Sequence, residues 1–373
     1  MQHSDFVVVG GGIAGASVAF GLATRGAAVT LIDDARTGRA TAAGAGIIQP
    51  WSSAISGAFY ELMAAGAAHY PLLLDRLAEL GITEVGYRRC GALVVNASTE
   101  VLDTVEASVR DRATRSMDVG EISRVDGERA RELWPPLAAD LAGLHIGGGA
   151  RVDGRLLCAA LIEAVQRLGG EVIHGTVTMD VSSASSVVIC NDTKIAAGTV
   201  VMAGGAWTIE LAESLGVPLG LEPQRGQISH LHLAGIDTSG WPSLSPQSDH
   251  YMVAFDGGRI VVGATRETGS GFDPRVTAHG QRHVLDNALR LSPGLTAATL
   301  LETRVGLRPL STDGFPIVGV VGEHASIHVA SGFGPVGLTV GPYVGDQLGN
   351  RLVSGEWDTN LDSFAPRSTV PLK

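Results

Sequence analysis

An α/β fold built from two structural units is what this sequence predicts, and three observations support that prediction. The chain opens with a strand, a glycine-rich turn, a helix and a second strand, the order of a β-α-β unit. Its later part changes to short strand-like segments separated by Gly, Pro, Asp and Ser, which favours antiparallel sheet. With 373 residues, 45% of them hydrophobic and 17% charged, the chain is long and apolar enough for a packed core larger than one ordinary domain.

The opening unit comprises an apolar run at residues 6–9, a helical stretch at residues 13–24 and a second apolar run at residues 29–32. Strands joined through such a helix lie parallel, so this unit predicts a parallel sheet.

The remaining elements follow from hydrophobic periodicity and from turn residues. Helices are expected at residues 58–80, 153–168 and 344–352, and strands at residues 92–95, 171–174, 199–202, 226–233 and 259–264. Pro71 is expected to kink or split the first of these helices, and Gly81 to follow its end. The stretch 86–144 is expected to be less regular, because it is more charged and shows little periodicity.

Charge and cysteine content exclude several classes of function. The formal net charge of −11 argues against binding to nucleic acid or to an anionic membrane, since both surfaces repel an acidic protein. Cys90, Cys158 and Cys190 lack the spacing of a zinc site or a disulfide framework. The N-terminus lacks the pattern of a secretory signal, so we expect a cytoplasmic protein. The uncharged stretches at residues 40–60 and 324–345 are interrupted by Pro, Gln, Ser and Gly, so we expect no membrane spans.

The glycine turn carries the first chemical signal. Gly10, Gly12 and Gly15 form GxGxxG between the predicted strand and helix, where a helix N-terminus can bind a pyrophosphate. The first glycine permits the turn, the second allows close approach of the phosphates, and the third allows close packing of helix and strand. Asp33 ends the second strand and can bind an adenosine ribose, which favours FAD or NAD over NADP; Asp34 is the alternative ribose ligand. A purely structural turn is the competing interpretation.

Six blocks of sequence, in order, resemble the FAD-dependent D-amino acid oxidase superfamily, most closely its bacterial glycine oxidase and D-amino acid dehydrogenase branch. The blocks are VVVGGGIAG at 7–15, TAAGAG at 41–46, RGQI at 225–228, VVGATRE at 261–267, GLRPLSTDGFPIVG at 306–319 and SGFGPVGLTVGP at 331–342. The resemblance implies a Rossmann-like FAD-binding domain interleaved with a substrate domain built on a mostly antiparallel sheet. We assign residues 1–85, 147–218 and 303–373 to the former, and residues 86–146 and 219–302 to the latter.

The resemblance further implies that FAD is bound non-covalently, because Gly306 stands where sarcosine oxidase-like members carry a tethering cysteine. The residues expected to bind FAD are Gly10, Gly12, Ile13, Ala14, Gly15, Asp33, Asp34, Thr41, Ala42, Ala43, Gly44, Gly46, Ile47, Val177, Ala203, Gly204, Gly205, Trp207, Gly306, Arg308, Gly332, Phe333, Gly334, Pro335, Val336, Gly337, Leu338 and Thr339. Without the resemblance, residues 41–46 would be interpreted as an ordinary loop and Val177 as a core valine. A strand-ending turn is the alternative for residues 203–206, but Gly204 and Gly205 favour a turn against the cofactor on the sequence alone.

The implied activity is oxidation of the carbon–nitrogen bond of a small amino acid or amine, such as glycine, a D-amino acid or an N-alkyl glycine. Arg308 is expected to bind the substrate carboxylate, because a planar guanidinium can donate two parallel hydrogen bonds to it. Tyr251 matches a tyrosine that family members aim at the substrate. A surface ion pair for Arg308 and a core position for Tyr251 are the alternatives.

Other substrate-pocket residues are less strongly indicated. Ile48, Gln49, Trp51 and Phe333 lie beside family blocks and are expected to line the pocket with Tyr251 and Arg308, although each could equally serve packing. Arg266 is a further candidate for a polar substrate group, with a solvent-facing strand position as its alternative.

In the implied reaction the α-carbon transfers a hydride to flavin N5, and the resulting imine hydrolyses to a keto acid; no dedicated general base is needed. In sarcosine oxidase-like members a lysine near the flavin activates oxygen, and residues 260–262, the matching strand here, contain no lysine. The expected electron acceptor is therefore either molecular oxygen or another acceptor. A dehydrogenase that passes electrons to a quinone or partner protein, the flavin subunit of a larger complex, and an NAD-dependent dehydrogenase are the competing hypotheses. A homo-oligomer is compatible with all of them.

Overall fold

A computed structural model describes residues 2–181 and 186–367, and in it the chain opens with the predicted β-α-β unit. The strands β1 (Gln2–Val9) and β2 (Val29–Asp33) pair in parallel and are joined by the helix α1 (Ile13–Ala23). Every residue of α1 is buried, since the helix lies between the sheet and two further helices. A helix apolar on all sides therefore fits its place in the core.

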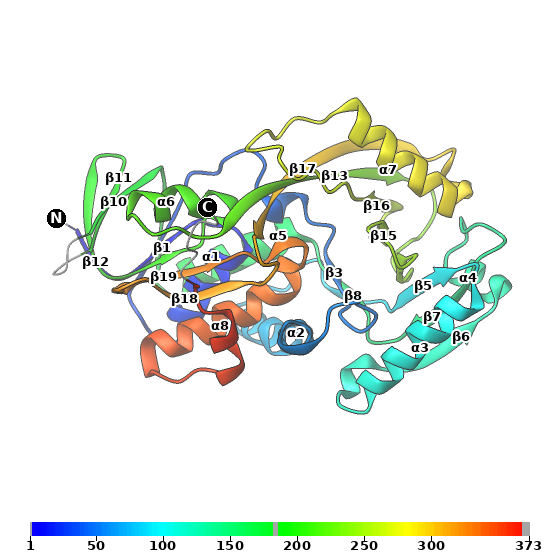
Figure 1. Cartoon of the computed structure of the whole chain (residues 1–373), viewed down its shortest axis with the longest axis horizontal. Coiled ribbons are helices and arrows are strands. Elements are labelled where there is room, and N and C mark those ends of the chain that lie inside the picture. Colours follow the sequence, from blue (N-terminus) through cyan, green and yellow to red (C-terminus); the bar gives the residue numbers. More distant parts are fainter. Residues whose placement is uncertain (1, 182–185, 368–373) are drawn as a thin grey trace.

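The first sheet has eight strands in the described residues. Its order is β10-β11-β12-β1-β2-β9, with β19 beside β12 and β18 beside β19. The additional strands are β9 (Glu171–His174), β10 (Val177–Val181), β11 (Ser186–Cys190), β12 (Thr193–Met202), β18 (Ile317–Val321) and β19 (His324–Ser331). On one face of this sheet α1 packs against α5 (Gly154–Arg167) and α8 (Gly337–Ser354), and α2 (Gly57–Glu79) packs against α8 (Figure 1). The short helix α6 (Thr208–Ser214) contributes Ala212 to the core on the other face.

The second sheet is mostly antiparallel, as the sequence predicts. Its order is β17-β13-β16-β15-β14-β5-β7-β6, and only the β14–β5 pair is parallel. The strands are β5 (Ala92–Asn96), β6 (Ile122–Val125), β7 (Ala142–Ile146), β13 (Leu221–His232), β14 (Ser243–Ser245), β15 (Tyr251–Ala254), β16 (Arg259–Gly263) and β17 (Thr299–Ser311). The helices beside this sheet are α3 (Thr99–Ala113), α4 (Gly127–Leu133) and α7 (Ala278–Leu291).

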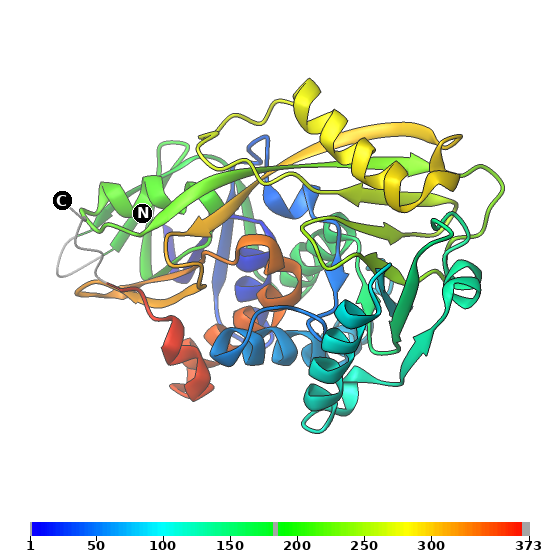
Figure 2. The same ribbon diagram turned by 45° about the vertical axis from the view of Figure 1, so that its right-hand side comes forward.

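The long antiparallel pair of strands β13 and β17 connects the two sheets in space. It arches over the molecule from the second sheet towards the first, with α7 lying along its outer side (Figure 2). A small third sheet of β3 (Ile47–Ile48), β8 (Ala150–Arg151) and β4 (Arg88–Arg89) lies between them. The residues where β17 passes the first sheet are therefore placed to contribute to a site between the two.

Several helices differ from the sequence prediction. The helix α2 continues through Pro71 as one element, so the proline does not split it, and Gly81 follows its end at a φ of 73°, as expected. The helix α8 begins at Gly337, seven residues before the predicted 344, since its Gly- and Pro-rich first turns hide the periodicity. The sequence prediction lacks the helices α3, α4, α6 and α7, and α7 lies in the stretch that was expected to form short strands.

The predicted boundary at residue 303 falls inside β17, which runs without interruption from Thr299 to Ser311. The division into two discontinuous domains remains a proposal.

Within the described residues, no helix combines the length and the apolar character that crossing a membrane requires.

Candidate active site

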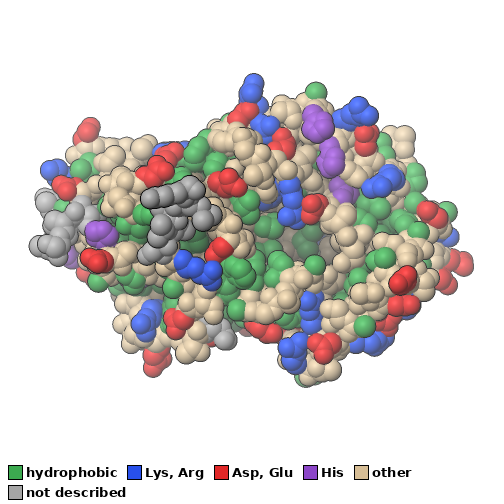
Figure 3. All heavy atoms as spheres, viewed as in Figure 1, with side chains coloured by type: hydrophobic (Ala, Val, Ile, Leu, Met, Phe, Trp, Pro, Cys, Tyr) green, Lys and Arg blue, Asp and Glu red, His purple; other side chains and the backbone are tan. Residues whose placement is uncertain are grey.

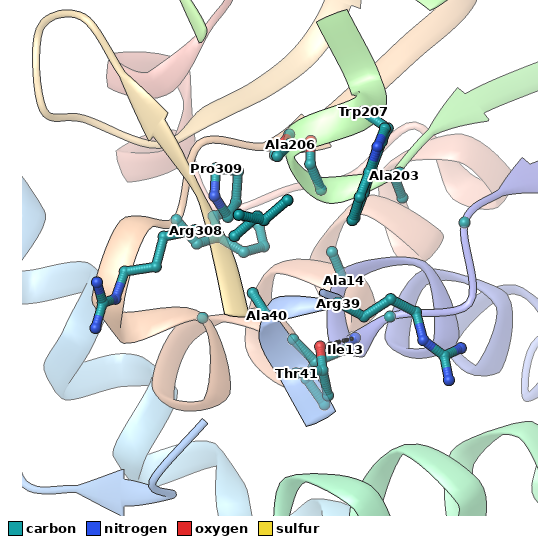
Figure 4. A pocket seen from close by; sticks show the side chains of 18 of the residues that line it. Ile13, Ala14, Arg39, Ala40, Thr41, Ala203, Ala206, Trp207, Arg308 and Pro309 are labelled. Carbon is teal, nitrogen blue, oxygen red and sulfur yellow. Dashed lines mark hydrogen bonds between the residues drawn. The ribbon is translucent and has the colours of Figure 1, made fainter. Parts of the chain in front are cut away.

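A cavity of about 510 Å³ lies between the two sheets, within the range of small-molecule and cofactor sites. It is lined by the glycine turn after β1, the loop from Arg36 to Ile47, the end of β12, the middle of β17 and the start of α8. One face of the molecule is hollowed near its middle, and acidic and basic side chains lie around the hollow (Figure 3). The close view of the cavity shows Arg308 reaching away from Ala203 and Trp207, so the cavity has two distinct ends (Figure 4).

At one end, the three glycines of the turn have separate physical roles. Gly10 has a φ of 110°, a conformation that disfavours any side chain. A Cβ on Gly15 would lie 1.8 Å from the carbonyl oxygen of Gly10, so the third glycine is required by packing. A Cβ on Gly12 would meet only Thr41 Oγ1, at 3.3 Å, and would otherwise fit within the described residues.

The N-terminus of α1 therefore opens onto the cavity. Gly12 is its N-cap and supplies no side-chain hydrogen bond to the first turn. The Ile13 N–H donates to Thr41 Oγ1 at 3.0 Å, which fixes the following loop beside this turn (Figure 4). Backbone N–H groups and the positive end of the helix dipole form a cradle suited to the pyrophosphate of FAD.

The acidic residues after β2 are held by arginines. Asp33 accepts hydrogen bonds from the Ala35 N–H at 2.8 Å and from Arg39 at 3.0 Å. Asp34 pairs with Arg36 at 2.5 Å, and Arg36 also reaches Glu210 at 2.6 Å. Asp33 is fixed at the cavity wall, where a ribose hydroxyl could bind.

Most residues expected to bind FAD lie in this cavity wall. They are Gly10, Gly12, Ile13, Ala14, Asp33, Asp34, Thr41, Ala43, Gly44, Gly46, Ile47, Val177, Ala203, Gly204, Gly205, Trp207, Gly306, Arg308, Phe333, Gly334, Pro335, Gly337, Leu338 and Thr339. Gly15, Ala42, Gly332 and Val336 are not among the lining residues. Ala42 instead offers its carbonyl oxygen to Arg155 Nε at 3.0 Å, on the side away from the cavity.

Several lining residues were missed by sequence reasoning. Arg36, Arg39, Gly226 and Asp249 line the cavity together with Gly11 and the residues on either side of Val177, at 175–176 and 178–179. Arg39 could have been suspected, because a cation six residues after an acid at a strand end can pair with it. Gly226 and Asp249 come from segments that only the fold brings to the cavity.

At the far end of the cavity lies Arg308, on β17. Its Nη1 donates to the Thr265 carbonyl oxygen at 3.0 Å and to Gln224 Oε1 at 3.4 Å, and the side chain also bonds the Tyr251 hydroxyl. Among residues 2–181 and 186–367, no carboxylate forms an ion pair with it. A partly enclosed guanidinium that has no carboxylate in direct contact favours an anionic ligand.

The position of Arg308 depends on a glycine in the neighbouring strand. A Cβ on Gly226 would lie 2.4 Å from Nη2 of Arg308, so the guanidinium lies flat over the bare backbone of β13. Burial raises the pKa of Tyr251, against the opposing charge of Arg308, so the phenol stays protonated at neutral pH. The two side chains can therefore both donate hydrogen bonds to one carboxylate.

A polar network beneath Arg308 explains two of the sequence blocks. Glu267 Oε2 accepts two hydrogen bonds from Arg225, at 2.7 and 3.0 Å, and its Oε1 accepts from Gln227 and Thr265. Arg225 also pairs with Asp273 at 2.8 Å. The network fixes the segment after β16, whose Thr265 carbonyl holds Arg308.

We expect Glu267→Gln to lower the free energy of unfolding by about 2 kcal/mol, the scale of a lost charge-assisted hydrogen bond. Burial opposes ionisation of Glu267, but hydrogen bonds from Thr265, Gln227 and Arg225 prevail and lower its pKa below 4.5. The stabilisation should therefore be complete above pH 4.5 and be lost as pH falls through the lowered pKa. Denaturant unfolding of both proteins at several pH values measures this difference, with Asp286→Asn in the exposed Arg282 pair as the control. Equal stability of wild type and Glu267→Gln at pH 7 would contradict the assignment.

The proposed substrate-pocket residues divide into two groups. Phe333, Tyr251 and Arg308 line the cavity, whereas Ile48, Gln49 and Trp51 are not among its lining residues. Trp51 packs with Leu102 and Val109 of α3 in a separate core cluster, and Gln49 bonds Ser52. A role for these three in substrate choice remains a prediction without support from the cavity.

His250 and His328 are buried outside the cavity lining. Burial lowers the pKa of each to about 4, so both are neutral at physiological pH.

The chain matches known proteins along nearly its whole length. A family model described as FAD dependent oxidoreductase, DAO, matches residues 5–351. The uncharacterized oxidoreductase YurR of Bacillus subtilis (strain 168) is 38% identical over 369 residues, covering 98% of this chain and 99% of that protein. The glycine oxidase of Geobacillus kaustophilus (strain HTA426) is 29% identical over 375 residues, covering 98% and 97%.

Among solved structures, iminodiacetate oxidase (IdaA) from Chelativorans sp. BNC1 has a TM-score of 0.94 and 42% identity, covering 97% of this chain and 98% of that one. Glycine oxidase from Geobacillus kaustophilus has a TM-score of 0.86 and 27% identity, covering 99% and 100%.

Proposed function

Because this chain belongs to the DAO family of FAD-dependent oxidoreductases, we propose that it oxidises the carbon–nitrogen bond of a small amino acid. Glycine, a D-amino acid and an N-alkyl glycine are the candidate substrates. The observation that carries this proposal is the guanidinium of Arg308 in the cavity wall, without a carboxylate partner among the described residues. The iminodiacetate oxidase relative, at 42% identity, favours an N-substituted glycine within this class.

The residues present fit FAD. The uncapped start of α1 would hold the pyrophosphate, Asp33 the ribose, and the residues around Val177 the adenine. The segment Phe333–Thr339, at the start of α8, would offer backbone N–H groups to the flavin ring.

Gly306 supports non-covalent binding. A Cβ there would already lie 3.0 Å from the Cβ of Ala43 and 3.1 Å from the Cα of Ala40, which leaves little room for a tethering side chain.

When bound, FAD would supply an acceptor for the hydride of the substrate α-carbon. Arg308 and Tyr251 would bind the carboxylate and hold the α-carbon in one orientation, which lowers the entropic part of the barrier. The oxidised product is an imine, and water hydrolyses it to a keto acid and ammonia or an amine.

Molecular oxygen is the proposed electron acceptor, because the two similar solved structures named above, iminodiacetate oxidase and glycine oxidase, are called oxidases. The sequence contains two lysines, Lys194 and Lys373, and Lys194 does not line the cavity. Oxygen reduction would therefore proceed without a lysine from the described part of the wall. Transfer to a quinone or a partner protein is the alternative.

An anaerobic titration of the flavin-loaded protein tests the proposal. Glycine, D-alanine and sarcosine should be compared with methylamine and dimethylamine, which lack the carboxylate. We expect bleaching of the flavin band at about 450 nm with at least one of the acids and with neither simple amine. Bleaching by the amines as readily as by the acids would contradict the role of Arg308. Slow recovery of the band in air would indicate another acceptor.

A further inference from the structure

A second arginine lies near Arg308 in the cavity wall. Arg266 directly follows Thr265, whose carbonyl oxygen binds Arg308, and Arg266 lines the same cavity. Its guanidinium pairs with Asp249 at 2.9 Å, and both side chains are open to solvent, at 47% and 68% exposure. The charge of Arg266 opposes protonation of Arg308, and the charge of Asp249 favours it. This places the pair within electrostatic reach of the proposed carboxylate site.

The charges at this end of the cavity do not cancel. Among the described lining residues, Arg308 and Arg266 carry positive charge here and Asp249 carries negative charge, while Tyr251 is neutral. The remaining charged lining residues are engaged at the other end, where Arg39 pairs with Asp33 and Arg36 with Asp34 and Glu210. The Arg308 end of the cavity therefore carries one net positive charge. A zwitterionic amino acid with one carboxylate has no net charge and leaves this excess in place, whereas an amino acid with two carboxylates cancels it.

We propose that Arg266 binds a second carboxylate, so that the enzyme prefers amino acids carrying two carboxylates over those carrying one. This inference rests on the proposed function, because Arg308 must bind the first carboxylate. Exposed ion pairs contribute little to stability, so a substrate carboxylate can displace Asp249 from Arg266 at little cost. The hydrogen bond from Arg308 to the Thr265 carbonyl oxygen holds the Arg308 guanidinium beside the backbone from which Arg266 extends.

Binding of unreactive ether analogues tests the proposal on the flavin-loaded enzyme. Diglycolate has two carboxylates and methoxyacetate has one, and neither has a carbon–nitrogen bond to oxidise. We expect Arg266→Gln to weaken diglycolate binding at least tenfold more than methoxyacetate binding. Asp249→Asn removes the carboxylate that pairs with Arg266, so it should strengthen diglycolate binding relative to methoxyacetate binding. Arg282→Gln, in an exposed pair on α7, is the matched control.

A ratio of affinities that stays within twofold in both variants, with melting temperatures like that of the wild type, would overturn the proposal. Steady-state kinetics with iminodiacetate, D-aspartate and sarcosine then shows whether the second carboxylate is carried on nitrogen or on carbon. If no amino acid reduces the flavin and neither ether acid binds, the proposed function fails. If sarcosine reduces the flavin but the ratio does not respond to Arg266, only the present inference fails.

Discussion

Replacement of Arg308 by glutamine is expected to lower kcat/KM for amino acids by about a hundredfold to a thousandfold, which corresponds to roughly 3–4 kcal/mol. The guanidinium is partly enclosed, is held by Thr265 and Tyr251, and has no carboxylate partner among the described residues. Removing it would leave the substrate carboxylate in the cavity without its counter-charge. Steady-state kinetics, normalised to bound flavin, measures the loss.

Two further variants separate charge from geometry. Arg308→Lys keeps the positive charge but loses the paired donors, so its kcat/KM should fall between those of the wild type and Arg308→Gln. Gly226→Ala keeps Arg308 but places a methyl group about where the guanidinium lies, 2.4 Å from Nη2, and should displace it. A loss smaller than tenfold in Arg308→Gln would show that the carboxylate binds elsewhere.

Gly12→Ala should weaken FAD binding by at least about a hundredfold while the chain still folds. Within the described residues the added methyl group would meet only Thr41 Oγ1, at 3.3 Å, and φ is −75°, so the backbone accepts alanine. The methyl group would instead keep the proposed pyrophosphate away from the N–H groups of α1, and each lost charge-assisted hydrogen bond costs about 1.5–3 kcal/mol. Titration of the flavin-free protein with FAD, followed by flavin fluorescence, gives the dissociation constant.

Gly15→Ala provides the contrast. Its methyl group would lie 1.8 Å from the Gly10 carbonyl oxygen, so this variant should lose folding stability whether or not FAD is supplied. Gly12→Ala with the affinity of the wild type would contradict the placement of the pyrophosphate at the start of α1.

The sequence predicts the parts of the fold whose residues have one clear environment. Residues 13–24 and 153–168 became α1 and α5 almost as expected, because an apolar run or stripe and clear end signals define them. The helix α3 escaped prediction because only Leu102, Val109 and Arg112 are buried in it, which leaves a weak stripe. Its signals were local instead: Ser98 accepts a hydrogen bond from the Val101 N–H, and Glu106 pairs with Arg110 one turn later.

The residues of the site also divide into those that the sequence predicts and those that it does not. The glycine turn and Arg308 lie in sequence blocks that point to them directly, and both line the cavity. Asp249 and Arg266 could not be paired from the sequence, because their contact depends on how the segments around β15 and β16 lie across the cavity. The interpretation of Arg266 as a solvent-facing residue was half correct, since it is exposed and also lines the cavity.

A single-turnover product analysis with sarcosine tests the central claim most directly. Sarcosine has two carbons that could lose hydride, the α-carbon beside the carboxylate and the N-methyl carbon. If Arg308 and Tyr251 hold the carboxylate so that the α-carbon reacts, anaerobic reduction of the flavin should yield about one equivalent each of glyoxylate and methylamine per flavin. Formation of formaldehyde and glycine would mean that the methyl carbon is the one oxidised, and would contradict the account.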